Sequence, residues 1–120
     1  TTNIRFKMKN LIKYFGVFIL FISFVACSSE PPGFRVKNEY TSKANVQIKT
    51  VANTFNINDV QPGTATDYRE VPEGLVEITA EIQNVVNEPE GSFNAQQDKN
   101  YTIVIVNSTP PVIRIDVSDK

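Results

Sequence analysis

The sequence contains no histidine and no tryptophan, and its only cysteine is Cys27. Without histidine the chain lacks the commonest general base and the imidazole ligands of most metal sites. A single cysteine excludes an intramolecular disulfide. Ser and Thr hydroxyls have no imidazole beside them to activate them as nucleophiles. These absences predict a chain that is not an enzyme and holds neither metal nor cofactor.

Positive charge is scarce after Cys27. Four of the 12 basic residues and none of the 13 acidic residues precede it, which leaves 8 basic against 13 acidic residues and a formal charge of −5. Binding to nucleic acid needs a basic surface against the phosphates, so we expect no nucleic-acid partner. The same acidity opposes electrostatic attachment to anionic lipid.

The one long apolar run lies near the start of the sequence. Lys9 and Lys13 introduce it, and the 13 residues from Tyr14 to Ala26 are almost all apolar. A basic start followed by a short apolar segment is typical of a signal peptide, and this run is shorter than the roughly 20 residues that span a bilayer. We therefore expect a signal helix within residues 8–26.

Phe24, Val25 and Ala26 stand directly before Cys27. This order resembles the lipobox of bacterial lipoprotein precursors, where an apolar residue, usually leucine, and two smaller residues precede an invariant cysteine. The resemblance implies that a signal peptidase recognises these three residues and that lipid on Cys27 anchors the chain. Because Ser28 replaces the aspartate that retains many lipoproteins at the inner membrane, it also implies the outer membrane. An uncleaved anchor with an incidental cysteine is the alternative.

Four segments follow from this interpretation. Residues 1–7 are expected to be translated sequence upstream of a start at Met8, and residues 8–26 the signal peptide. Residues 27–33 form a lipidated tether, in which two prolines and a glycine exclude a regular helix. Residues 34–120 are long enough for one small domain and no more.

Short alternating segments separated by turn residues fill this domain, which is typical of an all-β protein. The expected strands are residues 34–40, 44–50, 53–57, 65–71, 75–82, 92–95, 101–107 and 112–117. The segment 75–82 alternates most strictly, and 101–107 is apolar on both faces, as in a central strand. The sequence thus predicts an antiparallel, immunoglobulin-like sandwich of seven or eight strands in two sheets.

Several local features of this sandwich are also predicted. Asn58 and Asp59 are expected to begin a turn, and Pro62-Gly63 fit a type II turn because glycine accepts a positive φ angle. A second tight turn is expected at 72–74. In the last strand Ile113, Ile115 and Val117 are expected to point inward.

The order of FRVKN, ANVQI, DVQPGTATDYREVPEGLVEITA and DKNYTIVIV resembles a secreted domain family of bacterial lipoproteins, a domain of unknown function with an immunoglobulin-like or transthyretin-like sandwich. The matching positions are Arg35, Val36, Asn38, Val46, Pro72, Gly74, Lys99, Tyr101 and Thr102. The resemblance covers most of residues 34–117 and implies a sandwich without catalytic residues.

Three groups of residues are candidates for chemistry. Asn56, Asn58 and Asp59 could supply oxygen ligands to calcium, although the sequence favours capping of an Asx turn as their role. Glu88 and Glu90 form a carboxylate pair of the kind that glycosidases use, or a solvated loop. Tyr68 lies in the strand whose inward face is ambiguous, which makes it the candidate aromatic of a ligand surface.

The function expected from the sequence is therefore a non-enzymatic binding or structural module of the bacterial envelope. Its partners would be the membrane, through lipid on Cys27, and an envelope protein or a glycan. The alternative is a carbohydrate-binding accessory module at the cell surface.

Overall fold

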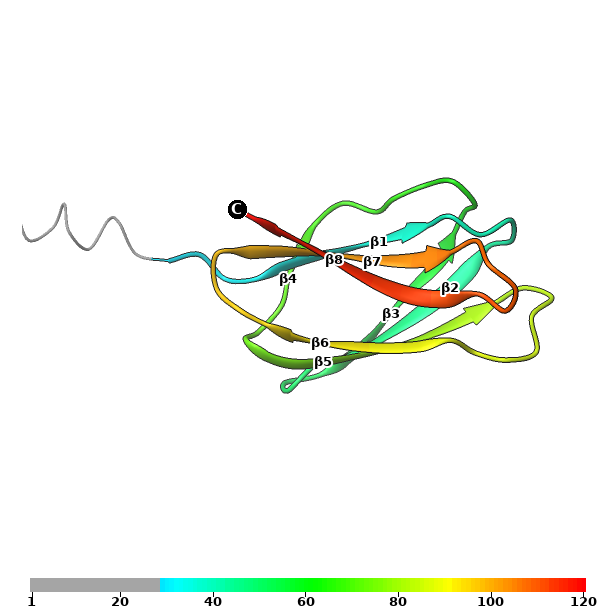
Figure 1. Ribbon diagram of the computed structural model, residues 1–120. Coiled ribbons are helices and arrows are strands. Elements are labelled where there is room, and N and C mark those ends of the chain that lie inside the picture. The colour runs from blue at the N-terminus through cyan, green and yellow to red at the C-terminus, as the bar shows by residue number, and fades with distance from the viewer. Residues whose placement is uncertain (1–28) are drawn as a thin grey trace, which may run out of the picture.

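The computed structural model describes residues 29–120, and it contains eight strands (Figure 1). In chain order they are β1 (Gly33–Asn38), β2 (Ala44–Lys49), β3 (Thr54–Val60), β4 (Arg69–Glu70), β5 (Gly74–Ile82), β6 (Glu90–Ala95), β7 (Lys99–Val106) and β8 (Val112–Asp119). No helix capable of crossing a membrane occurs in this part of the chain. The predicted signal helix and Cys27 lie outside the described residues.

Two four-stranded sheets face each other, with strand orders β4-β1-β7-β8 and β3-β2-β5-β6. This confirms the predicted all-β, two-sheet sandwich. One neighbouring pair, β1 and β7, runs parallel, whereas the other neighbouring strands pair antiparallel. The parallel pair is possible because the chain crosses to the second sheet and returns between β1 and β7, so no tight turn has to join them.

The core lies between the sheets and follows the predicted alternation. In β5, Val76, Ile78, Ala80 and Ile82 are buried, while Glu77 and Glu81 face solvent. The expected central strand is also confirmed, since β7 lies between β1 and β8. The buried members of the core are Phe34, Val36, Ala44, Val46, Ile48, Val60, Val71, Val76, Ile78, Ala80, Ile82, Ala95, Tyr101, Ile103 and Ile105.

The predicted turn at 58–59 is wrong, because both residues lie within β3. The register between β2 and β3 shifts between Ala44 and Val46, so Asn58 and Asp59 together oppose Asn45. Such a β-bulge accommodates one extra residue without ending the strand. Asp59 takes a φ of 56°, and its N–H donates to Oδ1 of Asn45 over 2.8 Å.

The turn follows the bulge, at the predicted Pro62-Gly63. Gly63 has a φ of 73°, and the N–H of Thr64 donates to the carbonyl of Gln61 over 3.2 Å. These features fit the type II turn that glycine makes possible.

Two further expectations fail at the margins of the first sheet. The segment 65–71 contains only the two-residue β4. The N–H of Thr66 donates to the carbonyl of Val36, but the N–H of Val36 donates to the side-chain hydroxyl of Thr66, so the regular backbone ladder is interrupted there. Val117 was expected inside but is 57% exposed. It lies near the end of β8, which has a strand neighbour on one side only.

Asn38 is the most completely buried polar side chain among residues 29–120, with no exposed surface. Its Nδ2 donates to the carbonyls of Ser42 and Val60, each over 2.9 Å. Its Oδ1 accepts the N–H of Tyr40 over 3.0 Å. The backbone of Asn38 bonds Thr64 and Gly63 as well. One residue therefore joins the end of β1 to the β1–β2 loop, the end of β3 and the Pro62-Gly63 turn.

We predict that Asn38→Ala lowers the free energy of unfolding by about 3 kcal/mol, from roughly 1 kcal/mol for each of three lost side-chain hydrogen bonds. Urea unfolding measures this change. Asn94→Ala is the matched control, because Asn94 is exposed on β6 and should change stability by less than about 0.5 kcal/mol. Equal stabilities of the two variants would contradict the role given to Asn38.

Candidate functional site

The segment that precedes β1 is held against the turn between β6 and β7. The Ser29 hydroxyl donates to Oε1 of Gln97 over 2.6 Å. The N–H of Glu30 donates to Oδ1 of Asp98 over 2.8 Å, and the N–H of Asp98 returns a bond to the carbonyl of Glu30 over 3.0 Å. The N–H of Lys120 also donates to the carbonyl of Asp98. The chain therefore enters and leaves the domain at one end, here called the tether end (Figure 1).

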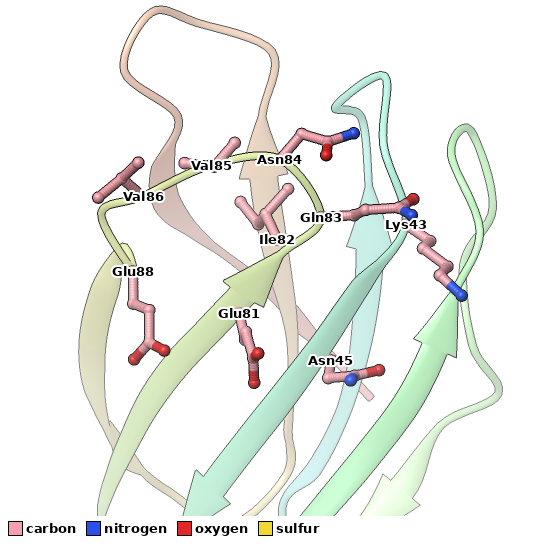
Figure 2. A pocket seen from close by; sticks show the side chains of 9 residues that line it. All are labelled: Lys43, Asn45, Glu81, Ile82, Gln83, Asn84, Val85, Val86 and Glu88. Atoms are coloured by element: carbon pink, nitrogen blue, oxygen red, sulfur yellow. The ribbon is translucent and has the colours of Figure 1, made fainter.

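The loops β1–β2, β5–β6 and β7–β8 gather at the opposite end, here called the far end (Figure 1). Beside the β5–β6 loop lies a hollow of about 460 Å³, here called the polar groove. Figure 2 shows Glu81 and Glu88 extending on the same side of the strands, with Lys43 and Asn45 across from them. The lining residues are Lys43, Asn45, Glu81, Ile82, Gln83, Asn84, Val85, Val86 and Glu88.

A second hollow of about 320 Å³ continues from the polar groove over the outer surface of β2, β3 and β5. We call it the amide face; it is lined by Asn45, Gln47, Asn56, Asn58, Thr79, Glu81 and Glu88. Strand register produces it, since Asn45 lies opposite Glu81, and Gln47 lies between Asn56 and Thr79. Side-chain amides donate and accept hydrogen bonds, and carboxylates accept them, so this surface suits a ligand rich in hydroxyl or peptide groups.

The calcium candidates are only partly brought together. Asn56 and Asn58 line the amide face, whereas Asp59 pairs with Lys43 over 3.6 Å. The side chain that caps a backbone N–H here belongs to Asn45, which accepts the bond from Asp59. Within residues 29–120, no three His, Cys, Asp or Glu residues are grouped to hold a metal ion.

The carboxylate candidates separate in space. Glu88 lines the polar groove, while Glu90 begins β6 and lines a different hollow together with Glu77 and Ser92. Both hollows are open to solvent. A glycosidase mechanism needs two carboxyl groups facing one substrate, and this arrangement does not provide that pair.

Tyr68 lies far from the polar groove in the fold, on the outer surface of the first sheet. Tyr68 is 44% exposed, and its ring carries the guanidinium of Arg35 at 4.7 Å from the ring centroid. The Tyr68 hydroxyl approaches Oγ1 of Thr102 at 3.5 Å, and Nε of Arg35 donates to the same oxygen over 3.1 Å. One side of the ring is thus occupied, and the exposed remainder is separate from the amide face. Its ligand role stays a prediction.

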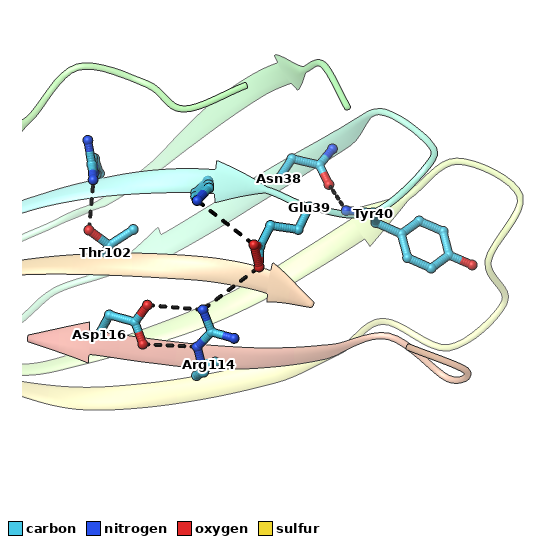
Figure 3. A network of polar contacts seen from close by, with 8 residues as sticks. Asn38, Glu39, Tyr40, Thr102, Arg114 and Asp116 are labelled. Carbon is cyan, nitrogen blue, oxygen red and sulfur yellow. Dashed lines mark hydrogen bonds and ion pairs between the residues drawn. The ribbon is translucent and has the colours of Figure 1, made fainter. Parts of the chain in front are cut away.

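Charged side chains cover the same sheet beyond Tyr68. Arg114 bonds Asp116 through two nitrogens, at 2.9 and 3.1 Å, and also approaches Glu39 at 3.8 Å (Figure 3). Lys37 lies 3.9 Å from Glu39. The hydrogen bond from Arg114 holds the pKa of the exposed Asp116 carboxyl below its ordinary value of 3.8. Because these groups are exposed, the ion pairs contribute little to stability.

The lowered pKa of Asp116 predicts that the stability of the fold decreases in acid. Because the pKa is lower in the folded protein, ionised Asp116 stabilises the fold above pH 3.8, and this contribution is lost as pH falls through the folded-state pKa. Arg114→Ala should raise the pKa of Asp116 toward 3.8, as measured by an NMR titration of side-chain carboxyls.

Lys99→Ala is the control for that titration. The hydrogen bond from Lys99 lowers the pKa of Asp119, so in this variant the pKa of Asp119 should rise while the pKa of Asp116 stays unchanged. An unchanged Asp116 pKa in Arg114→Ala would disprove the assignment.

The fold and these surfaces define a small two-sheet β-sandwich domain. No protein-family model matches the chain, and no curated protein matches it significantly. Cys27 and the residues expected to direct its processing, Phe24, Val25 and Ala26, lie outside the described residues, so their roles stay predictions.

Sequence reasoning missed the polar groove and the amide face. The available signal was the row of outward-facing polar residues, such as Asn45 and Gln47, in strands whose inward residues were correctly identified. Alternation marks those positions as exposed but does not show that three strands bring them together.

Proposed function

We propose that the protein is a lipid-anchored lipoprotein of the bacterial outer membrane, whose sandwich acts as a non-enzymatic binding or structural module of the envelope. The observation that carries this proposal is Cys27, placed directly after Phe24-Val25-Ala26 at the end of a basic-then-apolar segment. The acidic charge after Cys27 supports it further, because such a domain needs lipid to stay at an anionic membrane.

The arrangement of the domain is compatible with such an anchor. Ser29 is two residues from Cys27 in sequence and is bonded to Gln97 at the tether end. The polar groove lies at the far end, about 25 Å away for strands of some eight residues at roughly 3.3 Å each. Lipid at Cys27 therefore leaves the polar groove accessible to a partner.

Acyl labelling tests the anchor directly. In bacteria supplied with a labelled fatty acid, the wild-type protein should carry label, and Cys27→Ser should lose essentially all of it because the thiol that accepts the first chain is gone. Ser29→Ala is the matched control and should keep its label. Label that persists in Cys27→Ser, or is absent from the wild type, would overturn the proposed anchor.

Carbohydrate binding is the second candidate function, and the amide face is the observation that favours it. Asn45, Gln47 and Glu81 present donors and acceptors side by side on the surface, as sugar hydroxyls require. Neither hollow is lined by an aromatic residue, so recognition there would depend on hydrogen bonds without ring stacking. A sugar would then lie on the second sheet and away from Tyr68.

A glycan array probed with the full-length protein in detergent tests this candidate. If a glycan binds, the double variant Asn45→Ala, Gln47→Ala should weaken its affinity about 30-fold, from two hydrogen bonds of about 1 kcal/mol each. Tyr68→Ala should leave the affinity unchanged. Absence of any bound glycan would eliminate the candidate, and a loss confined to Tyr68→Ala would move the ligand surface to the first sheet.

A further inference from the structure

With eight residues, β8 is the longest of the four edge strands among residues 29–120. The edge strand β6 also pairs in an unbroken register, but it has only six residues. The edge strand β4 has two residues, and the edge strand β3 is interrupted by the bulge at 58–59. β8 instead pairs with β7 in one unbroken register from Val112 to Asp119. Short or bulged edges discourage pairing with another chain, whereas a long regular edge invites it.

The register identifies which groups of β8 are free. The N–H of Lys120 donates to the carbonyl of Asp98, so the pair 98–120 is hydrogen-bonded and every second pair along the ladder is too. Ile113, Ile115, Val117 and Asp119 occupy the intervening places, where backbone N–H and C=O groups point away from β7. The outer edge of β8 therefore offers a donor and an acceptor to an added strand at each of these four alternate residues.

The side chains of β8 are arranged symmetrically about Ile115. Arg114 and Asp116 flank it on the outer face of the sheet, as their cross-strand partners Val104 and Thr102 show. Ile113 and Val117 flank it on the inner face. A second β8 aligned antiparallel about Ile115 would place Arg114 opposite Asp116 of the other copy, twice.

We propose that β8 is a self-association edge, and that a second copy of this chain occupies it through antiparallel pairing centred on Ile115. Opposite charges then face each other at non-hydrogen-bonded places, where cross-strand side chains are closest. On the inner face, Ile113 lies opposite Val117 of the second copy. This contact covers Val117, a residue that is 57% exposed in the single chain.

Charge selects this register over its neighbours. A pairing centred on Arg114 places two arginines opposite each other, and one centred on Asp116 places two aspartates opposite each other. If one strand slips by an odd number of residues from the register centred on Ile115, inward side chains of one copy lie opposite outward side chains of the other. The added strand would then present its faces the wrong way round. Only the register centred on Ile115 keeps both the faces and the charges complementary.

The pairing is independent of the proposed anchor but compatible with it. The two-fold axis that relates the two copies is perpendicular to the joined sheet. The tether ends of the two copies therefore lie at opposite ends of that sheet. Copies anchored in one membrane would then lie with their strands along its plane. The contact is confined to one strand per copy, so it belongs to the small and weak class of interfaces.

Charge reversal gives a sharp test. Sedimentation equilibrium of the full chain, in density-matched detergent with micelles in excess, should show a reversible rise toward twice the monomer mass below about 1 mM chain. Arg114→Asp alone and Asp116→Arg alone should each stay monomeric, because each places like charges opposite each other. An equimolar mixture of these two variants should regain the dimer, since every facing pair is then of opposite charge.

The double variant Arg114→Asp, Asp116→Arg should dimerise like the wild type. Glu77→Lys on the outer face of the second sheet is the control for a change of charge away from the edge and should not alter association. Circular dichroism checks that each variant is folded, and the recovery in the mixture also requires folded chains. Monomeric wild type at 1 mM, or single variants that associate as the wild type does, would overturn the proposal.

Discussion

The buried amide of Asn38 is the constraint on which the far end of the domain depends. A polar group without solvent must have its hydrogen bonds satisfied inside the protein, and Asn38 meets this condition through Tyr40, Ser42 and Val60. These bonds set the path of the β1–β2 loop, which leads directly to Asn45 and the polar groove. A residue at the end of the first strand thereby shapes a surface formed mainly by the second sheet.

The two sheets share one core but present different chemistry outward. The β3-β2-β5-β6 sheet exposes amides and carboxylates along three neighbouring strands, whereas the β4-β1-β7-β8 sheet exposes ion pairs around Arg114 and the stacked Arg35–Tyr68 pair. A partner on the amide face and a second copy on β8 would occupy different sheets, so the two proposals do not compete for one surface.

Anchoring and edge pairing would also reinforce each other physically. Confinement to a membrane raises the effective concentration of neighbouring copies, so an edge too weak to hold a dimer in dilute solution can still be populated there. In the same way, paired copies present two polar grooves, and a repeated envelope ligand would bind both more tightly than either one alone. Because the domain carries a net negative charge, contacts between other surfaces of two copies are repulsive. This favours pairing at an edge whose charges are complementary.

The sequence by itself determined the alternation of β2 and β5, the two apolar faces of the central strand β7, the Pro62-Gly63 turn and the all-β class, because these depend on neighbouring residues and on a period of two. The proposed lipidation of Cys27 also depends on the sequence alone. Only the tertiary structure decided the parallel β1–β7 pair, the bulge at 58–59, and the polar groove built from residues 43 to 88. These depend on which strands become neighbours and in what register, and that is settled by packing between segments far apart in the chain.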